Sequence, residues 1–203
     1  MKRKPIFITG IGTSVGKTVT SAILVEKLQA DYWKPIQSGD LHDTDTDRVR
    51  GLVTNQVSVF HPESYRLTQP FSPHKAAALD KVSIDMENIL LPQTDNLLII
   101  EGAGGLMVPL NEKDLMIDLI KKFDAEVVLV SKNYLGSINH TILSAEILKS
   151  RNIDLCKIIF CGEEDESSEK IISQHLDITI LQFPLFESLD KNEILNFSAN
   201  LIL

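Results

Sequence analysis

Short apolar runs alternate along the chain with longer segments in which apolar residues recur every three or four positions. We interpret the runs as strands, over Pro5–Thr9, Leu97–Glu101, Glu126–Ser131, Lys157–Cys161 and Ile178–Gln182, with Tyr32–Lys34 as a weaker candidate. We interpret the periodic segments as helices, over Lys17–Gln29, Asp114–Phe123, Ser137–Arg151 and Ser167–His175. Apolar strands that alternate with helices are typical of a parallel sheet covered on both faces. The pattern therefore predicts the α/β class, with ligands beyond the carboxyl ends of the strands.

Two stretches follow neither pattern. Asp40–Asp47 is polar, and Ser58–Pro73 contains three prolines and resembles a loop. Connections of this length in a compact domain favour a functional role over a tight turn. The chain has 203 residues, of which 43% are hydrophobic, so we expect one domain over residues 1–203 with a single sizeable core.

Charge and cysteine content exclude several classes of protein. The net charge is −8, which opposes binding to a phosphate backbone, so we expect no nucleic-acid partner. Apolar runs all fall short of the roughly 20 residues that span a bilayer, so we expect no membrane partner. Cys156 and Cys161 are the two cysteines, and we interpret them as free thiols of a cytoplasmic protein.

A glycine-rich loop, Gly10–Thr18, lies between the first predicted strand and the first predicted helix. This order and the Gly-Lys-Thr ending are typical of a phosphate-binding loop, whose backbone amides and helix start surround phosphate oxygens. Lys17 should reach the terminal phosphates, and the hydroxyl of Thr18 should hold Mg²⁺. Five residues separate Gly10 from Gly16, where the common pattern has four. We therefore predict a P-loop NTPase fold that binds ATP with Mg²⁺.

Carboxylates near this loop are candidates for the metal. Glu101 ends an apolar strand, and an acid in that place commonly faces Mg²⁺ in P-loop proteins. The glycines of 102–105 then let the chain pass close to a ligand. Asp43, Asp45 and Asp47 alternate with threonine, and spacing alone does not choose among them.

Lys34 follows a weak strand candidate and could stabilise charge on a transferring phosphoryl group. Taken alone, a lysine in this place is more often a surface residue. It becomes informative together with its neighbours, because motifs over roughly residues 5–145 resemble those of the dethiobiotin synthetase family. The resemblance rests on Thr9–Thr18, on Lys34-Pro35-x-x-Ser38-Gly39, on Thr46-Asp47, on Ser72-Pro73-His74, on Glu101–Gly105 and on Leu135–His140. The five-residue spacing in the loop is that family's own pattern.

The resemblance implies an activity. It implies the ATP- and Mg²⁺-dependent carboxylation of 7,8-diaminononanoate with CO₂ and closure of the ring to dethiobiotin, in biotin biosynthesis. The route runs through a carbamate and a carbamic–phosphoric anhydride. The resemblance also implies a homodimer in which the substrate site lies at the interface.

The resemblance assigns roles to particular residues. It gives Mg²⁺ the neighbours Thr18, Asp47 and Glu101, which selects Asp47 among the three acids. It assigns catalytic roles to Lys34, Lys17 and Thr13. It gives the nucleotide Gly12, Thr13, Ser14, Val15, Gly16, Lys17, Thr18, Val19, Asp47, Glu101, Gly102, Ala103, Gly104, Cys161, Gly162, Pro184, Leu185 and Phe186. It implies that the diamine and its carbamate are bound by Thr13, Lys34, Ser38 and Gly104. The partner subunit would add Gly136, Ser137 and Asn139 to this site. Ser137 could also cap the helix that begins there.

Two positions depart from the family pattern. The family often has glutamate where Ser14 stands, and an Asn-Asp-like pair that reads adenine where Cys161-Gly162 stands. A thiol is a weak hydrogen-bonding partner. We therefore expect loose selectivity for the base, or selectivity supplied by the backbone of Pro184–Phe186.

Other functions remain as alternatives. A switch ATPase of the partition or septum-site type shares the loop, but it usually carries a second, signature lysine where this chain has Gly12. A cobyrinate-type amide ligase needs a glutamine-hydrolysing domain, for which 203 residues leave no room. A non-enzymatic nucleotide-binding module would not need the complete set of motifs.

Overall fold

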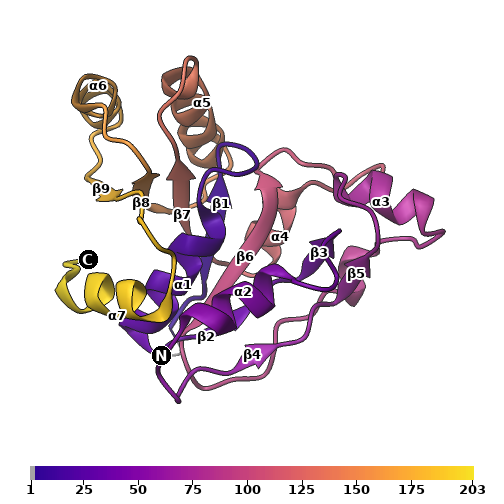
Figure 1. The fold of residues 1–203 in the computed structure, drawn as a ribbon. Coiled ribbons are helices and arrows are strands. Elements are labelled where there is room, and N and C mark those ends of the chain that lie inside the picture. The colour runs from indigo at the N-terminus through magenta and orange to yellow at the C-terminus, as the bar shows by residue number, and fades with distance from the viewer. Residues whose placement is uncertain (1–2) are drawn as a thin grey trace.

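A computed structural model describes residues 3–203. Its main sheet has seven parallel strands in the order β4-β2-β6-β1-β7-β8-β9, and β3 and β5 form a separate parallel pair (Figure 1). The strands are β1 (Ile6–Gly10), β2 (Asp31–Trp33), β3 (Ile36–Ser38), β4 (Phe60–His61), β5 (Tyr65–Leu67), β6 (Leu98–Gly105), β7 (Glu126–Ser131), β8 (Leu155–Cys161) and β9 (Ile180–Phe183). Across these described residues, no helix has the length and apolar character that a membrane crossing requires.

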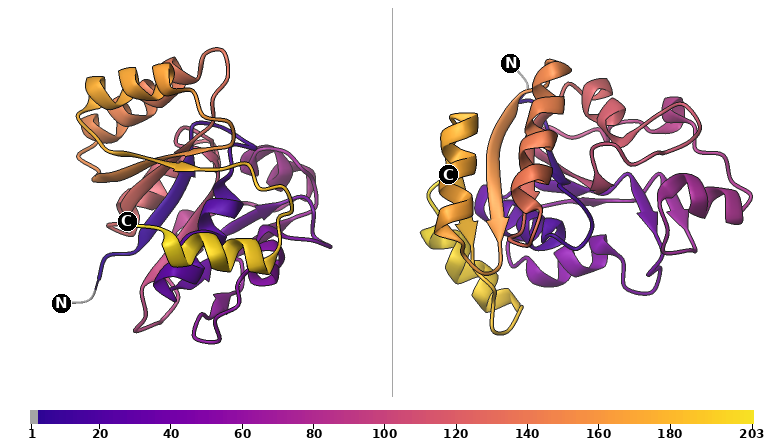
Figure 2. Two further views of the ribbon diagram at one scale, coloured as in Figure 1. Left: turned by 60° about the vertical axis from the view of Figure 1, so that its left-hand side comes forward. Right: turned by 90° about the horizontal axis from the view of Figure 1, so that it is seen from above.

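Helices cover both faces of the sheet (Figure 2). They are α1 (Lys17–Leu28), α2 (Asp45–Leu52), α3 (Pro73–Leu79), α4 (Met116–Lys122), α5 (Ser137–Ser150), α6 (Glu166–Leu176) and α7 (Lys191–Asn200), with a 3₁₀ turn, η1 (Met86–Asn88). Helix α1 packs with α2 and α7 on one face, whereas α4 and α5 lie on the other. Because parallel strands buried on both faces need cover on both, this arrangement confirms the predicted α/β class.

The core forms on both sides of the same strands. Successive side chains of a strand point to opposite faces, so Phe7 joins the apolar cluster beneath α4 while Ile8 joins the cluster beneath α1. Ile99 and Ile100 of β6 divide in the same way. All of these side chains are fully buried. The central strands are therefore held rigidly, and the loops at their carboxyl ends start from fixed points.

The predicted strands and helices are present, with ends that differ from the prediction by at most four residues. The elements that the sequence did not predict are β3, β4, β5, α2, α3, α7 and the short η1. Helix α2 occupies part of the polar stretch that was expected to be a loop. Its first turn is held by a capping box, in which Thr44 and Asp47 bond reciprocally to each other's backbone amides.

Candidate active site at the carboxyl ends of the central strands

The phosphate-binding loop connects β1 to α1, as its sequence predicts. Gly16 is the N-cap of α1 and has a φ of 104°, in the left-handed region that favours glycine. A β-carbon at Gly16 would also lie 2.6 Å from Cβ of Cys161, so the close packing of the loop on β8 requires glycine here. No side chain caps α1, which leaves the amides of its first turn available to an anion.

Lys17 lies inside this loop. Its side chain folds back, and Nζ donates a hydrogen bond of 2.9 Å to the carbonyl oxygen of Gly12. Burial lowers the pKa of Lys17 to about 8, although the carboxylate of Glu101 acts in the opposite direction. The ammonium group therefore lies at the centre of the loop, where phosphates of a nucleotide would meet it.

Glu101 is the centre of a buried polar cluster. Its side chain, on β6, is only 1% exposed, and β6 pairs directly with β1 so that Ile8 lies opposite Glu101. Oε1 lies 3.0 Å from Oγ1 of Thr18 and 3.1 Å from Nζ of Lys34. The three predicted residues Thr18, Lys34 and Glu101 therefore come together, although they are far apart in the sequence.

Asp45 completes this cluster. Its carboxylate forms an ion pair with Lys34, and Oδ1 lies 3.2 Å from Oγ1 of Thr18. Burial alone would raise the pKa of Asp45, but the ammonium of Lys34 outweighs it and holds this pKa below its ordinary value. Burial would likewise lower the pKa of Lys34, but Glu101 and Asp45 together raise it. Asp45 and Lys34 therefore both remain charged at neutral pH.

Asp47, which was expected near the metal, forms no hydrogen bond with Thr18 or Glu101 in the part of the chain that the structure describes. Asp47 lies two residues further along α2, on a different side of the helix, and its carboxylate caps the first turn through Thr44. It also pairs with Arg50 at 2.9 Å, and its side chain is 48% exposed. Asp45, at the first position of α2, takes the place next to Thr18.

The oxygens of Thr18, Asp45 and Glu101 suit Mg²⁺. This ion prefers oxygen ligands in octahedral geometry, with bonds of about 2.0–2.1 Å and adjacent oxygens therefore about 2.9 Å apart. In the structure, Oγ1 of Thr18 lies 3.0 Å from Oε1 of Glu101 and 3.2 Å from Oδ1 of Asp45. One or two carboxylates are usual where phosphates supply the remaining ligands. Among the described residues there is no group of three acids, histidines or cysteines that could hold a metal without such help.

Two residues that the sequence analysis missed hold Glu101 in place. Oγ of Ser21 and the phenol of Tyr32 donate to Oε2 of Glu101 at 2.7 Å and 3.0 Å. Burial and the Glu101 carboxylate keep the pKa of Tyr32 well above its ordinary value, so the phenol stays protonated and donates. Oε2 is thus fully engaged, and Oε1 faces Thr18 and Lys34.

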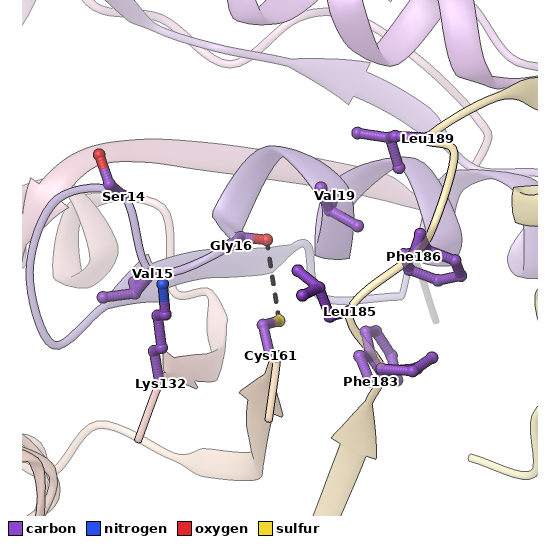
Figure 3. A pocket seen from close by; sticks show the side chains of 12 residues that line it. Ser14, Val15, Gly16, Val19, Lys132, Cys161, Phe183, Leu185, Phe186 and Leu189 are labelled. Carbon is purple, nitrogen blue, oxygen red and sulfur yellow. Dashed lines mark hydrogen bonds between the residues drawn. The ribbon is translucent and has the colours of Figure 1, made fainter. Parts of the chain in front are cut away.

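A cavity of about 250 Å³ opens beside the loop, between α1 and the ends of β8 and β9 (Figure 3). It brings together most of the predicted nucleotide residues outside the phosphate site, namely Ser14, Val15, Gly16, Val19, Cys161, Gly162, Pro184, Leu185 and Phe186. Lys132, Phe183 and Leu189 also line it and were not predicted. The walls are mostly apolar, which suits the flat face of a nucleotide base.

Polar groups inside this cavity are few. The thiol of Cys161 lies 3.3 Å from Oγ1 of Thr20 and 4.0 Å from the carbonyl of Gly16, and burial raises its pKa to about 11. The backbone amide of Gly162 donates to Phe183, and the carbonyl of Gly162 accepts from Gln182. The Cys161-Gly162 pair therefore offers little hydrogen bonding to a base.

The residues predicted for the diamine fall into two groups. Thr13 lies beside Gly104, since a β-carbon at Gly104 would be 3.8 Å from Oγ1 of Thr13. Ser38, at the end of β3, has a buried hydroxyl without a hydrogen-bond partner among the described residues. Thr13, Lys34, Ser38 and Gly104 form the first group. Gly102 and Ala103, which were predicted for the nucleotide, form the part of β6 between Glu101 and Gly104.

The second group, Gly136, Ser137 and Asn139, lies at the start of α5. Ser137 does not cap this helix, which corrects the prediction: Gly136 is the N-cap, no side chain caps it, and the Ser137 hydroxyl accepts from the amide of Tyr134. Within residues 3–203, none of the hydrogen bonds in the structure joins this group to the cluster around Glu101. The amides of the first turn are nevertheless free of side-chain caps.

Comparison with known proteins identifies relatives of this chain. A family model described as an AAA domain matches residues 4–192. The ATP-dependent dethiobiotin synthetase BioD of Christiangramia forsetii is 56% identical over 171 residues, which cover 84% of this chain and 82% of that protein. The protein of the same name from Cytophaga hutchinsonii is 54% identical over 179 residues, covering 88% and 86%.

Solved structures show the fold only. The cell division ATPase MinD of Pyrococcus furiosus has a TM-score of 0.60 over 97% of this chain and 98% of that one, with 11% sequence identity. At that identity the likeness extends to the arrangement of strands and helices. It carries no argument for the switch ATPase alternative.

Proposed function

We infer the course of the reaction from one premise: the chain belongs to the family of ATP-dependent dethiobiotin synthetases and is a ligase that forms dethiobiotin at the expense of ATP. In our proposal 7,8-diaminononanoate reacts with CO₂ to form a carbamate on one amine. An oxygen of the carbamate attacks the γ-phosphorus of ATP, and ADP leaves. The second amine then attacks the carbonyl carbon, and inorganic phosphate leaves as the five-membered ureido ring closes.

The single observation that carries this proposal is the cluster of Thr18, Lys34, Asp45 and Glu101 next to the P-loop. Phosphoryl transfer asks little covalent chemistry of a protein, and positioning with charge stabilisation dominates. Mg²⁺, held by Thr18, Asp45 and Glu101, would neutralise phosphate charge. Asp45 takes in this proposal the role that the family resemblance gave to Asp47.

Charge is the main obstacle that these side chains would overcome. The carbamate and ATP are both anions, and two unit charges 4 Å apart repel by about 4 kcal/mol at an effective dielectric constant of 20. Lys17 lies in the loop and Lys34 lies at the edge of the cluster. We propose that Lys17 binds the terminal phosphates and that Lys34 stabilises the transferring phosphoryl group and the carbamate. Thr13, in the loop, and Ser38, at the end of β3, would orient the carbamate.

The experiment is to incubate the enzyme with the diamine, bicarbonate, Mg²⁺ and ATP and to detect the cyclic urea by mass spectrometry. Bicarbonate labelled with ¹³C should add one mass unit to the product. Bicarbonate labelled with ¹⁸O should deliver one ¹⁸O atom to the released phosphate, because the oxygen that attacks phosphorus leaves with it. Product without ¹⁸O in the phosphate would disprove the anhydride route while leaving the activity intact.

We expect weak discrimination among nucleotide bases. The cavity offers the base apolar walls and a weakly bonding thiol, and the Gly162 backbone groups are already paired. Sites without specific hydrogen bonds discriminate by roughly ten- to a hundredfold at most. The value of kcat/KM for GTP and CTP should therefore lie within about tenfold of the value for ATP, measured by steady-state release of phosphate.

A matched control separates the thiol from the cavity walls. Cys161→Ala removes the only side-chain hydrogen-bonding group at the end of β8, and we expect the GTP-to-ATP ratio to stay unchanged. A preference for ATP well above a hundredfold, or its loss in Cys161→Ala, would contradict the expectation. The first result would assign base reading to the backbone of Pro184–Phe186.

We further propose that the chain acts as a homodimer through the start of α5. Leu135 is completely exposed, and Tyr134 and Ile138, within three residues of it, are exposed as well, as is Leu143 further along α5. An apolar patch of this kind is typical of a protein–protein contact. The uncapped first turn of α5 follows directly, so a dimer through this patch would bring free amides near a partner's substrate, where they could bind its carboxylate.

Leu135→Glu tests this dimer. A charge in the middle of the patch should yield monomers in light scattering coupled to size exclusion, and it should raise KM for the diamine by about tenfold or more. Affinity for ATP should change little, because the P-loop lies elsewhere. Leu90→Glu, at another strongly exposed leucine, is the matched control and should remain dimeric. A wild-type protein that is monomeric at micromolar concentration would refute the proposal.

A further inference from the structure

Lys34 occupies an unusual position for a lysine. It follows β2, its side chain is only 5% exposed, and its ammonium group contacts both Asp45 and Glu101. A buried lysine is expected only where carboxylates compensate its charge. Here it has two such partners, and they are the two acids that the metal site requires.

The acids in turn depend on Lys34. Glu101 is almost fully buried, and in the described part of the chain Lys34 is the one basic side chain within 4 Å of it. Asp45 has one further basic neighbour, Arg48, whose nearest nitrogen is 3.9 Å away and whose side chain is 45% exposed. Buried carboxylates without a compensating cation are strongly unfavourable. The ammonium of Lys34 supplies the compensation.

The same oxygens cannot serve both cations fully. Lys34 bonds to Oε1 of Glu101 at 3.1 Å, and this is the oxygen that faces Thr18. A divalent cation held by Thr18, Asp45 and Glu101 would therefore lie next to the ammonium, and the two positive charges would repel. The other oxygen, Oε2, is taken by Ser21 and Tyr32, so Glu101 cannot turn to offer it.

From this geometry we propose that the ammonium of Lys34 is the resident cation of the metal site in the nucleotide-free enzyme. When metal and nucleotide bind together, this ammonium group moves away from Asp45 and Glu101 and binds the anions of the substrate instead. Phosphate and carbamate oxygens would then accept the hydrogen bonds that the carboxylates lose. The inference rests on the proposed function for the identity of those anions, but its test requires neither diamine nor turnover.

The test measures the binding of Mn²⁺ alone, by electron paramagnetic resonance, in protein without nucleotide. The wild type should bind Mn²⁺ weakly, because Lys34 occupies the carboxylates. Lys34→Met should bind it at least about tenfold more tightly, because Glu101 then has no basic side chain within 4 Å among the described residues and Asp45 loses its nearest one. Lys34→Gln keeps a hydrogen-bond donor for Glu101 and should show the same gain.

Three further results decide the matter. Lys132→Met removes a lysine that lines the neighbouring cavity and should leave Mn²⁺ affinity unchanged. Lys34→Met combined with Asp45→Asn should lose the gain, because one of the freed acids is gone. If both single variants unfold, Mn²⁺ should restore their circular dichroism signal. Unchanged or weaker Mn²⁺ binding in Lys34→Met, or no recovery of a variant that unfolds, would overturn the inference even if the wild type makes dethiobiotin.

Discussion

Asp45→Asn is expected to reduce kcat/KM for dethiobiotin formation by about 10²–10³-fold, the loss typical when a group that stabilises transition-state charge is removed. The substitution keeps the size of the side chain and removes its charge, so the oxygen beside Thr18 becomes a poor ligand for Mg²⁺. The required Mg²⁺ concentration should rise as well. Steady-state assays at several Mg²⁺ concentrations measure both effects.

Asp47→Asn is the matched control, with the same chemical change two residues away. Asp47 caps α2 and pairs with Arg50 at the surface, so its loss should cost about 1 kcal/mol of stability and leave kcat/KM within about twofold. Thermal unfolding followed by circular dichroism measures the first effect. If Asp47→Asn abolished turnover while Asp45→Asn did not, the metal site would have to be reassigned to Asp47.

Lys34→Ala should lower kcat by about 10³-fold while leaving the affinity for a non-hydrolysable ATP analogue within about fivefold. Lys34 faces the cluster of acids, whereas the loop and the cavity that would hold the nucleotide contain other groups. Lys17→Ala, in the loop itself, should weaken both quantities. Single-turnover kinetics and calorimetric titration separate them.

The two lysines therefore predict a contrast. Equal losses of nucleotide affinity in Lys34→Ala and Lys17→Ala would show that Lys34 serves the nucleotide rather than the reacting group. Unchanged kcat in Lys34→Ala would remove it from the mechanism altogether.

The P-loop and the central strands could be predicted from the sequence because their signals are local. An apolar run followed by a glycine-rich loop ending in Gly16-Lys17-Thr18 needs no knowledge of distant segments. The position of Glu101 at the end of an apolar run is of the same kind. The cavity beside the loop, in contrast, is formed by four separate segments. Only the resemblance to a family indicated that three of them meet, and nothing indicated the fourth, at Lys132.

Asp45 shows why the rest is harder. Three aspartates alternate with threonine, and their roles depend on where α2 begins. The sequence held the signal, because Thr44-x-x-Asp47 matches a capping box and engages Asp47 in the helix start. Once Thr44 is the N-cap, Asp45 is the first helical residue and points elsewhere.

Ser21 and Tyr32 carry weaker local signals. Ser21 lies three residues after Thr18 on α1 and therefore on the same face, and Tyr32 lies two residues before Lys34 and therefore on the same side of the chain. Neither spacing identifies a partner. That both donate to Glu101 follows from the packing of α1 and β2 against β6, which only the structure gives.

The order of strands has a consequence for synthesis of the protein. β1 and β2 come early in the chain, yet β6 lies between them, and Thr18 meets Glu101 across 83 residues. Closing a loop of this length before the contacts form slows folding. A nascent chain that has not reached Leu98 cannot bring the P-loop and Lys34 together, however complete its first helix is. Nucleotide binding should therefore arise only after the β6 segment has left the ribosome.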